Sequence, residues 1–193
     1  MITFNHTRQC FSGVWKAGDI SLSIQYKIRD NMSDSVGLVT SILVRYPEVA
    51  TIIFNPEQQV LKLTFILNQK PDFMAIETMK SRVTESIEVY NFLEGNKPGL
   101  VLIGLQECDQ FTLIEIQRDV DTLVQEEIAL IVQLFYDFFG NCLVTDYNNS
   151  YFEEDLLMQE EIIEQMLENV KIKSDNKHWY AFREEGRVLV FNK

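Results

Sequence analysis

The sequence has few of the residues on which common catalytic motifs depend. It contains only two histidines, His6 and His178, and only three cysteines, Cys10, Cys108 and Cys142, none of them in a C-x-x-C pair. It also lacks the glycine-rich patterns G-x-G-x-x-G and G-x-x-x-x-G-K-S/T, which form phosphate-binding loops. These absences remove the usual signs of zinc sites, imidazole catalysis and nucleotide binding. They favour a protein that is not an enzyme and needs no cofactor.

Long apolar runs are also missing. The longest, residues 128–139, is interrupted by Gln133 and Asp137 and is shorter than the roughly 20 residues of a membrane-spanning helix. Residues 1–11 do not show the basic and then apolar order of a signal peptide. An odd number of widely separated cysteines favours reduced thiols. We therefore expect a cytoplasmic protein without a membrane segment.

Basic residues are scarce in the middle of the chain. The net charge is −12, and residues 101–170 hold one arginine against sixteen acidic residues, whereas residues 171–193 hold six basic residues against three acidic ones. An acidic surface repels phosphate backbones, so nucleic-acid binding is disfavoured. The exception is the 177–193 segment, a predicted hairpin in which aromatic and basic side chains are interleaved. A basic protein partner suits the rest of the surface better.

Apolar residues make up 46% of the chain, and their spacing predicts a mixture of helices and strands. Alternation of apolar and polar residues predicts a first strand over residues 20–28. A capping-box pattern of Thr122 and Gln125 predicts the start of the apolar helix that ends near residue 139. The remaining predicted elements are a helix (36–46), a hairpin (49–54 and 60–67), a helix (71–94), a hairpin (99–107 and 111–118), a helix (150–170) and a hairpin (178–183 and 187–192).

This order predicts an α+β fold. From residue 20 to 107 it reads βαββαβ, which is the order of a ferredoxin-like core, in which two helices cover one face of an antiparallel sheet. The length of 193 residues fits a single domain. We expect its core to span about residues 20–140, with a helical and hairpin extension over residues 141–193.

In its acidic composition and in the αββαββα order of residues 34–140, the chain resembles secretion-type chaperones. The resemblance implies a dimer that binds extended segments of client proteins. Our leading interpretation is therefore an interaction or regulatory module for a protein partner.

Two features are candidates for the partner surface. Glu160, Glu164 and Glu168 recur every four residues, which places them in one row on a helix without interleaved basic residues. The helix that carries Phe135 and Phe139 is apolar on nearly all sides, so a sheet alone cannot cover it. Its second cover is either the helix of residues 150–170 or the same helix of a second copy in a two-fold homodimer.

Two alternatives stay open. The first is a hydrolase or nuclease that holds a divalent metal with carboxylates, for which Asp119 and Asp121 are the candidate ligands beside the glutamate row. Both aspartates also suit the cap of the following helix. The second alternative is a small-ligand sensor with its site in a crevice between helix and sheet.

Overall fold

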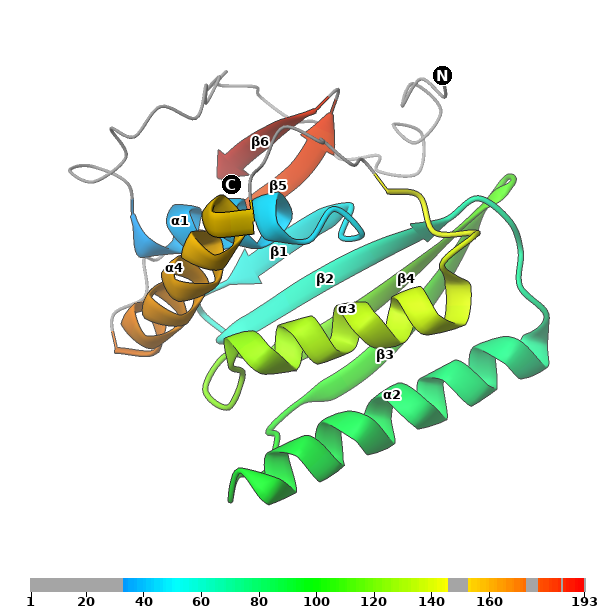
Figure 1. Ribbon diagram of the computed structural model, residues 1–193, viewed down its shortest axis with the longest axis horizontal. Helices are drawn as coiled ribbons and strands as arrows, with labels where there is room; N and C mark the ends of the chain where they lie inside the picture. The colour runs from blue at the N-terminus through cyan, green and yellow to red at the C-terminus, as the bar shows by residue number, and fades with distance from the viewer. Residues whose placement is uncertain (1–32, 146–152, 173–176, 185, 193) are drawn as a thin grey trace.

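The computed structural model describes residues 33–145, 153–172, 177–184 and 186–192 (Figure 1). The described chain is α+β, as predicted, with four helices and one six-stranded antiparallel sheet. The strand predicted for residues 20–28 lies outside the described residues. None of the helices in the described ranges is long and apolar enough to cross a bilayer.

The elements follow one another in the predicted order from the first described helix onward. They are α1 (Asp34–Arg45), β1 (Thr51–Asn55), β2 (Val60–Leu67), α2 (Phe73–Leu93), β3 (Val101–Cys108), β4 (Phe111–Asp119), α3 (Gln125–Phe139), α4 (Glu153–Ile172), β5 (Trp179–Glu184) and β6 (Arg187–Asn192).

The sheet joins three hairpins side by side, in the strand order β3-β4-β2-β1-β5-β6. Strand β2 pairs along its whole length with β4, from Val60 opposite Asp119 to Leu67 opposite Thr112. Strand β1 pairs on its other side with β5, so the C-terminal hairpin extends the same sheet. The ferredoxin-like order is not confirmed, because each described strand pairs with its neighbour in a hairpin and the hairpins then meet edge to edge.

One face of the sheet carries the core beneath the helices. Alternate residues of β2 point to this face, and Phe65 stacks on Phe135 of α3 with ring centroids 3.9 Å apart. The opposite face of the same strands is more polar, and Lys62 pairs there with Glu115 at 3.1 Å. The core therefore lies between the sheet and the helices, and all four helices contribute buried side chains to it.

Helix α4 lies beside α1 rather than on the sheet (Figure 1). Its apolar stripe of Ile163, Leu167 and Val170 is fully buried. Gly37 of α1 allows the helices to approach closely, because a Cβ at this position would lie 3.1 Å from the sulfur of Met166. The second side of α3 contacts α2 and α4 of the same chain.

Two helix starts show how local chemistry fixes the ends. Asp72 caps α2 by accepting a 2.8 Å hydrogen bond from the backbone N–H of Ala75. The predicted capping box of Thr122 is wrong, because α3 begins at Gln125 and its cap residue, Val124, makes no side-chain hydrogen bond. Thr122 binds the carboxylate of the preceding strand instead.

Candidate functional site

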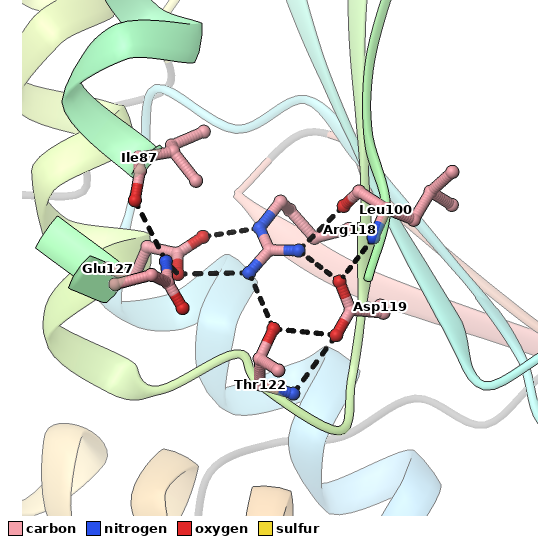
Figure 2. Close-up of polar contacts among 7 residues, drawn as sticks. Ile87, Leu100, Arg118, Asp119, Thr122 and Glu127 are labelled. Carbon is pink, nitrogen blue, oxygen red and sulfur yellow. Dashed lines mark hydrogen bonds and ion pairs between the residues drawn. The ribbon is translucent and has the colours of Figure 1, made fainter. Parts of the chain in front are cut away.

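A buried arginine lies at the end of β4, where the sheet meets α3 (Figure 2). Arg118 is only 1% exposed. Its Nε donates to Glu127 Oε1 at 2.5 Å, and its second terminal nitrogen donates to Glu127 Oε2 at 3.1 Å. This two-point ion pair joins the strand to the first turn of α3 and neutralises both buried charges.

Asp119 completes the strand side of this network. Its carboxylate pairs with the Arg118 guanidinium and accepts a 2.7 Å hydrogen bond from the backbone N–H of Leu100. It also accepts from the hydroxyl of Thr122 at 2.6 Å and from the backbone N–H of Thr122 at 3.1 Å. Arg118 in turn donates to the carbonyl of Leu100 at 2.6 Å. The residue that precedes β3 is thereby fixed to the end of β4.

Helix α2 is attached to the same network through Asn91. The amide nitrogen of Asn91 donates to Glu127 Oε2 at 2.7 Å and to the carbonyl of Ile87 at 2.9 Å. Glu127 and Asn91 are both buried. The Arg118 network therefore connects β4, the start of β3, α3 and the C-terminal part of α2 through buried polar contacts.

The charges in the network stabilise one another. Burial raises the pKa of Asp119, but hydrogen bonds from Thr122 and Leu100 and the charge of Arg118 outweigh it, so the pKa lies below its usual value. Burial lowers the pKa of Arg118, but the hydrogen bonds and charges of Glu127 and Asp119 outweigh it and raise the pKa. Partners within the network thus hold Arg118 and Asp119 in the ionised state, which suits a structural frame better than proton transfer.

The two predicted metal ligands do not form a metal site in the described part of the chain. Asp119 is occupied by Arg118, Leu100 and Thr122, as described above. Asp121 is exposed. Within the described ranges, no three histidine, cysteine or acidic side chains lie close enough together to hold a metal ion.

The predicted partner-binding residues fall into two groups. Phe135 and Phe139 are buried in the core. Glu160 pairs with Arg45 of α1 at 2.6 Å, and Glu168 pairs with Lys171 at 2.8 Å. Glu164 is exposed on the same helix. The acidic row is therefore present on α4, but one of its three members is already bound to α1.

One cysteine departs from expectation, whereas the C-terminal hairpin forms as predicted. Cys142 is a free thiol, whereas Cys108 is disulfide-bonded, so the prediction of reduced thiols is wrong at Cys108. In the hairpin, Phe182 and Phe191 stack on each other at 5.5 Å, and Arg183 is buried. These two rings and this arginine are therefore less available to contact a nucleic acid.

The most unusual surface was not predicted from the sequence. On α2, Phe92 is 79% exposed, Met74 is 69% exposed and Val89 is also exposed. On the neighbouring β3, Leu102 is 53% exposed and Leu105 is partly exposed. Clusters of exposed apolar side chains mark surfaces that bind other molecules. A signal was available, because these α2 residues lie off the helical face that Ile76, Met79, Val83 and Ile87 bury.

A shallow groove separates α2 from β3. It has a volume of about 180 Å³ and is lined by Pro71, Phe73, Ile76, Glu77, Lys80, Leu105, Glu107 and Thr112. Pockets for small-molecule ligands are larger, roughly 300–1,000 Å³. Comparisons with protein families, curated proteins and solved structures find no match to this chain.

Proposed function

We propose that this protein is a non-enzymatic interaction module that binds an extended segment of a partner polypeptide along β3. The observation that carries this proposal is a sheet edge that no other described strand pairs with, that is free of charged side chains over residues 101–106, and that lies beside exposed apolar side chains. A chaperone-like role in which the module holds a client segment fits such a surface.

The edge strand has the features of a strand-addition site. Among the described residues, β3 pairs only with β4, so one side of its backbone is left to accept another strand. Natural edge strands are commonly protected by charged side chains or proline. Residues 101–106 contain neither. An added strand would gain main-chain hydrogen bonds along this edge.

The side chains of β3 provide contacts on both faces of such a strand. Leu105 is paired with Ile114, on the helix-covered face, and lines the groove beside Phe73. Leu102 is paired with Gln117 and points to the opposite face. A bound segment with alternating apolar side chains would reach the groove on one face and Leu102 on the other.

The test is capture of short synthetic peptides by the full chain, measured by fluorescence polarisation. Peptides with alternating apolar residues should bind, whereas matched peptides with a central proline should not, because proline removes a main-chain donor. The substitution Leu102→Asp should weaken capture roughly tenfold or more, equivalent to about 1.4 kcal/mol. The matched control Leu157→Asp changes an equally exposed leucine of α4 and should have no effect. Equal capture of the proline peptides, or full capture by Leu102→Asp, would refute the proposal.

The acidic row of α4 supports a second contact, to a basic segment of the same partner. Glu164 and Glu168 are exposed, and opposite charges steer partners toward each other. The double substitution Glu164→Lys with Glu168→Lys should weaken capture of lysine-rich peptides at low salt and leave uncharged peptides unaffected. Unchanged capture of lysine-rich peptides would show that the acidic row of α4 does not bind the partner. A cytoplasmic location stays a prediction of the sequence.

A further inference from the structure

The groove between α2 and β3 contains a buried hydroxyl group without a partner. Thr112 is the most buried residue of the groove lining, with only 1% of its surface exposed. Its Oγ1 forms no hydrogen bond with any of the residues that the structure describes. Buried polar groups in folded proteins nearly always have a partner, because an unpaired one is costly. A side chain that enters the groove with a hydrogen-bonding tip would supply the missing partner.

The groove has room for one ring. Its volume of about 180 Å³ is close to that of an engineered protein cavity of about 150 Å³ that binds benzene. Phe73 and Ile76 of α2 and Leu105 of β3 supply apolar walls. An aromatic side chain of a bound segment therefore fits the groove better than a drug-sized molecule does.

The charged side chains that line the groove are already paired. Lys80 Nζ lies 2.9 Å from Glu77 Oε1, and Glu107 Oε2 lies 2.8 Å from Lys70 Nζ. A charged tip would lose its water shell in the groove without meeting a free opposite charge. The groove therefore suits a side chain whose tip is polar but neutral.

The position of Thr112 requires a long side chain. Thr112 pairs with Glu107 and Ile114 pairs with Leu105, so all four side chains lie on the face that α2 covers. A strand added outside β3 would lie two strand spacings, about 9.5 Å, from β4. Its residue opposite Leu105 would point to the same face and so enter the groove. A serine or threonine at that position is too short to cross β3 and reach the Thr112 hydroxyl.

We propose that the partner segment carries a tyrosine opposite Leu105, with its ring in the groove and its hydroxyl bonded to Thr112 Oγ1. This inference rests on the strand addition proposed for β3. Tyrosine combines an apolar ring, a neutral hydroxyl and sufficient length, and either hydroxyl can donate to the other. Phenylalanine fills the same space but leaves Thr112 unpaired, and a site that binds a hydroxyl rejects the analogue that lacks it. The module thus selects extended segments that contain tyrosine.

The test uses synthetic peptides that share one alternating sequence and differ only at the central position. Their binding to the full chain is measured by fluorescence polarisation. The tyrosine peptide should bind roughly tenfold more tightly than the phenylalanine peptide, equivalent to about 1.4 kcal/mol. A lysine peptide should bind more weakly than both. Phe73→Ala should weaken the tyrosine and phenylalanine peptides by similar factors, because both rings contact this wall of the groove.

A matched pair of threonine variants isolates the hydroxyl. Thr112→Val removes the hydroxyl and keeps the shape of the side chain, so the preference for tyrosine should disappear while the phenylalanine peptide still binds. Thr64→Val is the control, because Thr64 is also 1% exposed, its hydroxyl also lacks a partner among the described residues, and it does not line the groove. This variant should keep the full preference. Circular dichroism should show that both variants are folded.

Two results would overturn the tyrosine proposal alone. They are equal or tighter binding of the phenylalanine peptide by the wild-type protein, and a tyrosine preference that persists in Thr112→Val. In both cases capture that is still weakened by Leu102→Asp would leave strand addition to β3 intact. Failure of every alternating peptide to bind would overturn strand addition, and the tyrosine proposal with it.

Discussion

The helices at the two ends of the sheet bury their apolar side chains to different extents. At the β1-β5-β6 end, α1 lies against the strands and α4 covers α1, so the apolar stripe of α4 is buried within the chain. At the β3 end, α2 lies beside the sheet (Figure 1). It buries one of its faces, and apolar side chains stay exposed on its other face and on the edge strand β3. The helices have similar lengths, 21 residues in α2 and 20 in α4. The difference therefore lies in where the apolar residues fall around each helix.

The two helices are also held in place by different kinds of contact. The α1–α4 contact is made by buried aliphatic side chains, with Gly37 at the close approach. Helix α2 is held in part by Asn91, through the buried network of Arg118 and Glu127. A polar anchor of this kind fixes the helix position at one place and leaves its outer face available. Surfaces for binding work best on such a rigid frame.

The largest expected effect comes from breaking the polar anchor. Arg118→Ala should lower the free energy of unfolding by about 3–5 kcal/mol, because it leaves Glu127 and Asp119 buried without their partner. Urea denaturation followed by circular dichroism measures this loss. The surface pair of Lys62 and Glu115 is the control, and Lys62→Ala should cost less than about 1 kcal/mol. A loss below about 1 kcal/mol for Arg118→Ala would mean that the network does not hold this end together.

A matched pair of leucines tests the apolar difference directly. Leu167→Ala, on the buried stripe of α4, should cost about 2–5 kcal/mol, because it leaves a cavity. Leu93→Ala, at the exposed end of α2, should change the free energy of unfolding by less than about 0.5 kcal/mol. Thermal and urea denaturation of the two variants supply the numbers. Similar losses of unfolding free energy in the two variants would contradict the claim that α4 buries its leucine and α2 exposes its own.

The smallest effect depends on pH and concerns the contact between α1 and α3. Tyr46 is buried and accepts a 2.8 Å hydrogen bond from Gln125, and burial raises the pKa of Tyr46 to about 12. A raised folded-state pKa gives stability that is complete below about pH 10 and is lost as the pH rises toward 12. Wild-type protein should therefore lose about 2–3 kcal/mol of unfolding free energy over that interval.

Tyr46→Phe provides the reference for this loss. Phenylalanine does not ionise, so the variant should be less stable at neutral pH but should decline less between pH 10 and 12. Urea denaturation at several pH values gives both curves. Parallel curves for the two proteins would contradict the assignment to Tyr46.

Much of the fold could be predicted because the spacing of apolar residues along a segment indicates which of its faces is buried. The hairpin of β1 and β2 and the buried face of α2 follow from the spacing of apolar residues, as at Ile76, Met79 and Val83. The order of hairpins in the sheet could not be predicted in this way. Pairing between β2 and β4, or between β1 and β5, joins segments that are far apart in the chain, and each strand carries the same alternating pattern whichever neighbour it has.

The polar network shows a second limit. Arg118, Asp119 and Thr122 are close in sequence, and the last two were predicted to be caps or metal ligands. Their role changes because Glu127 of α3 pairs with the buried Arg118, and Asn91 of α2 donates a hydrogen bond to Glu127. Tertiary contacts thus decided between roles that the local sequence left open. The exposed apolar residues of α2 could have been found, because Met74 and Phe92 do not fit the buried face.

The most direct test of the central claim is hydrogen–deuterium exchange of the full chain, alone and with a captured alternating peptide. If partners bind at the β3 end, exchange should slow in residues 101–108, because their outward N–H groups become hydrogen-bonded. Exchange in residues 153–172 of α4 should change little with an uncharged peptide. Slowing confined to α4, with no change in β3, would contradict the assignment of the binding surface to the β3 end of the sheet.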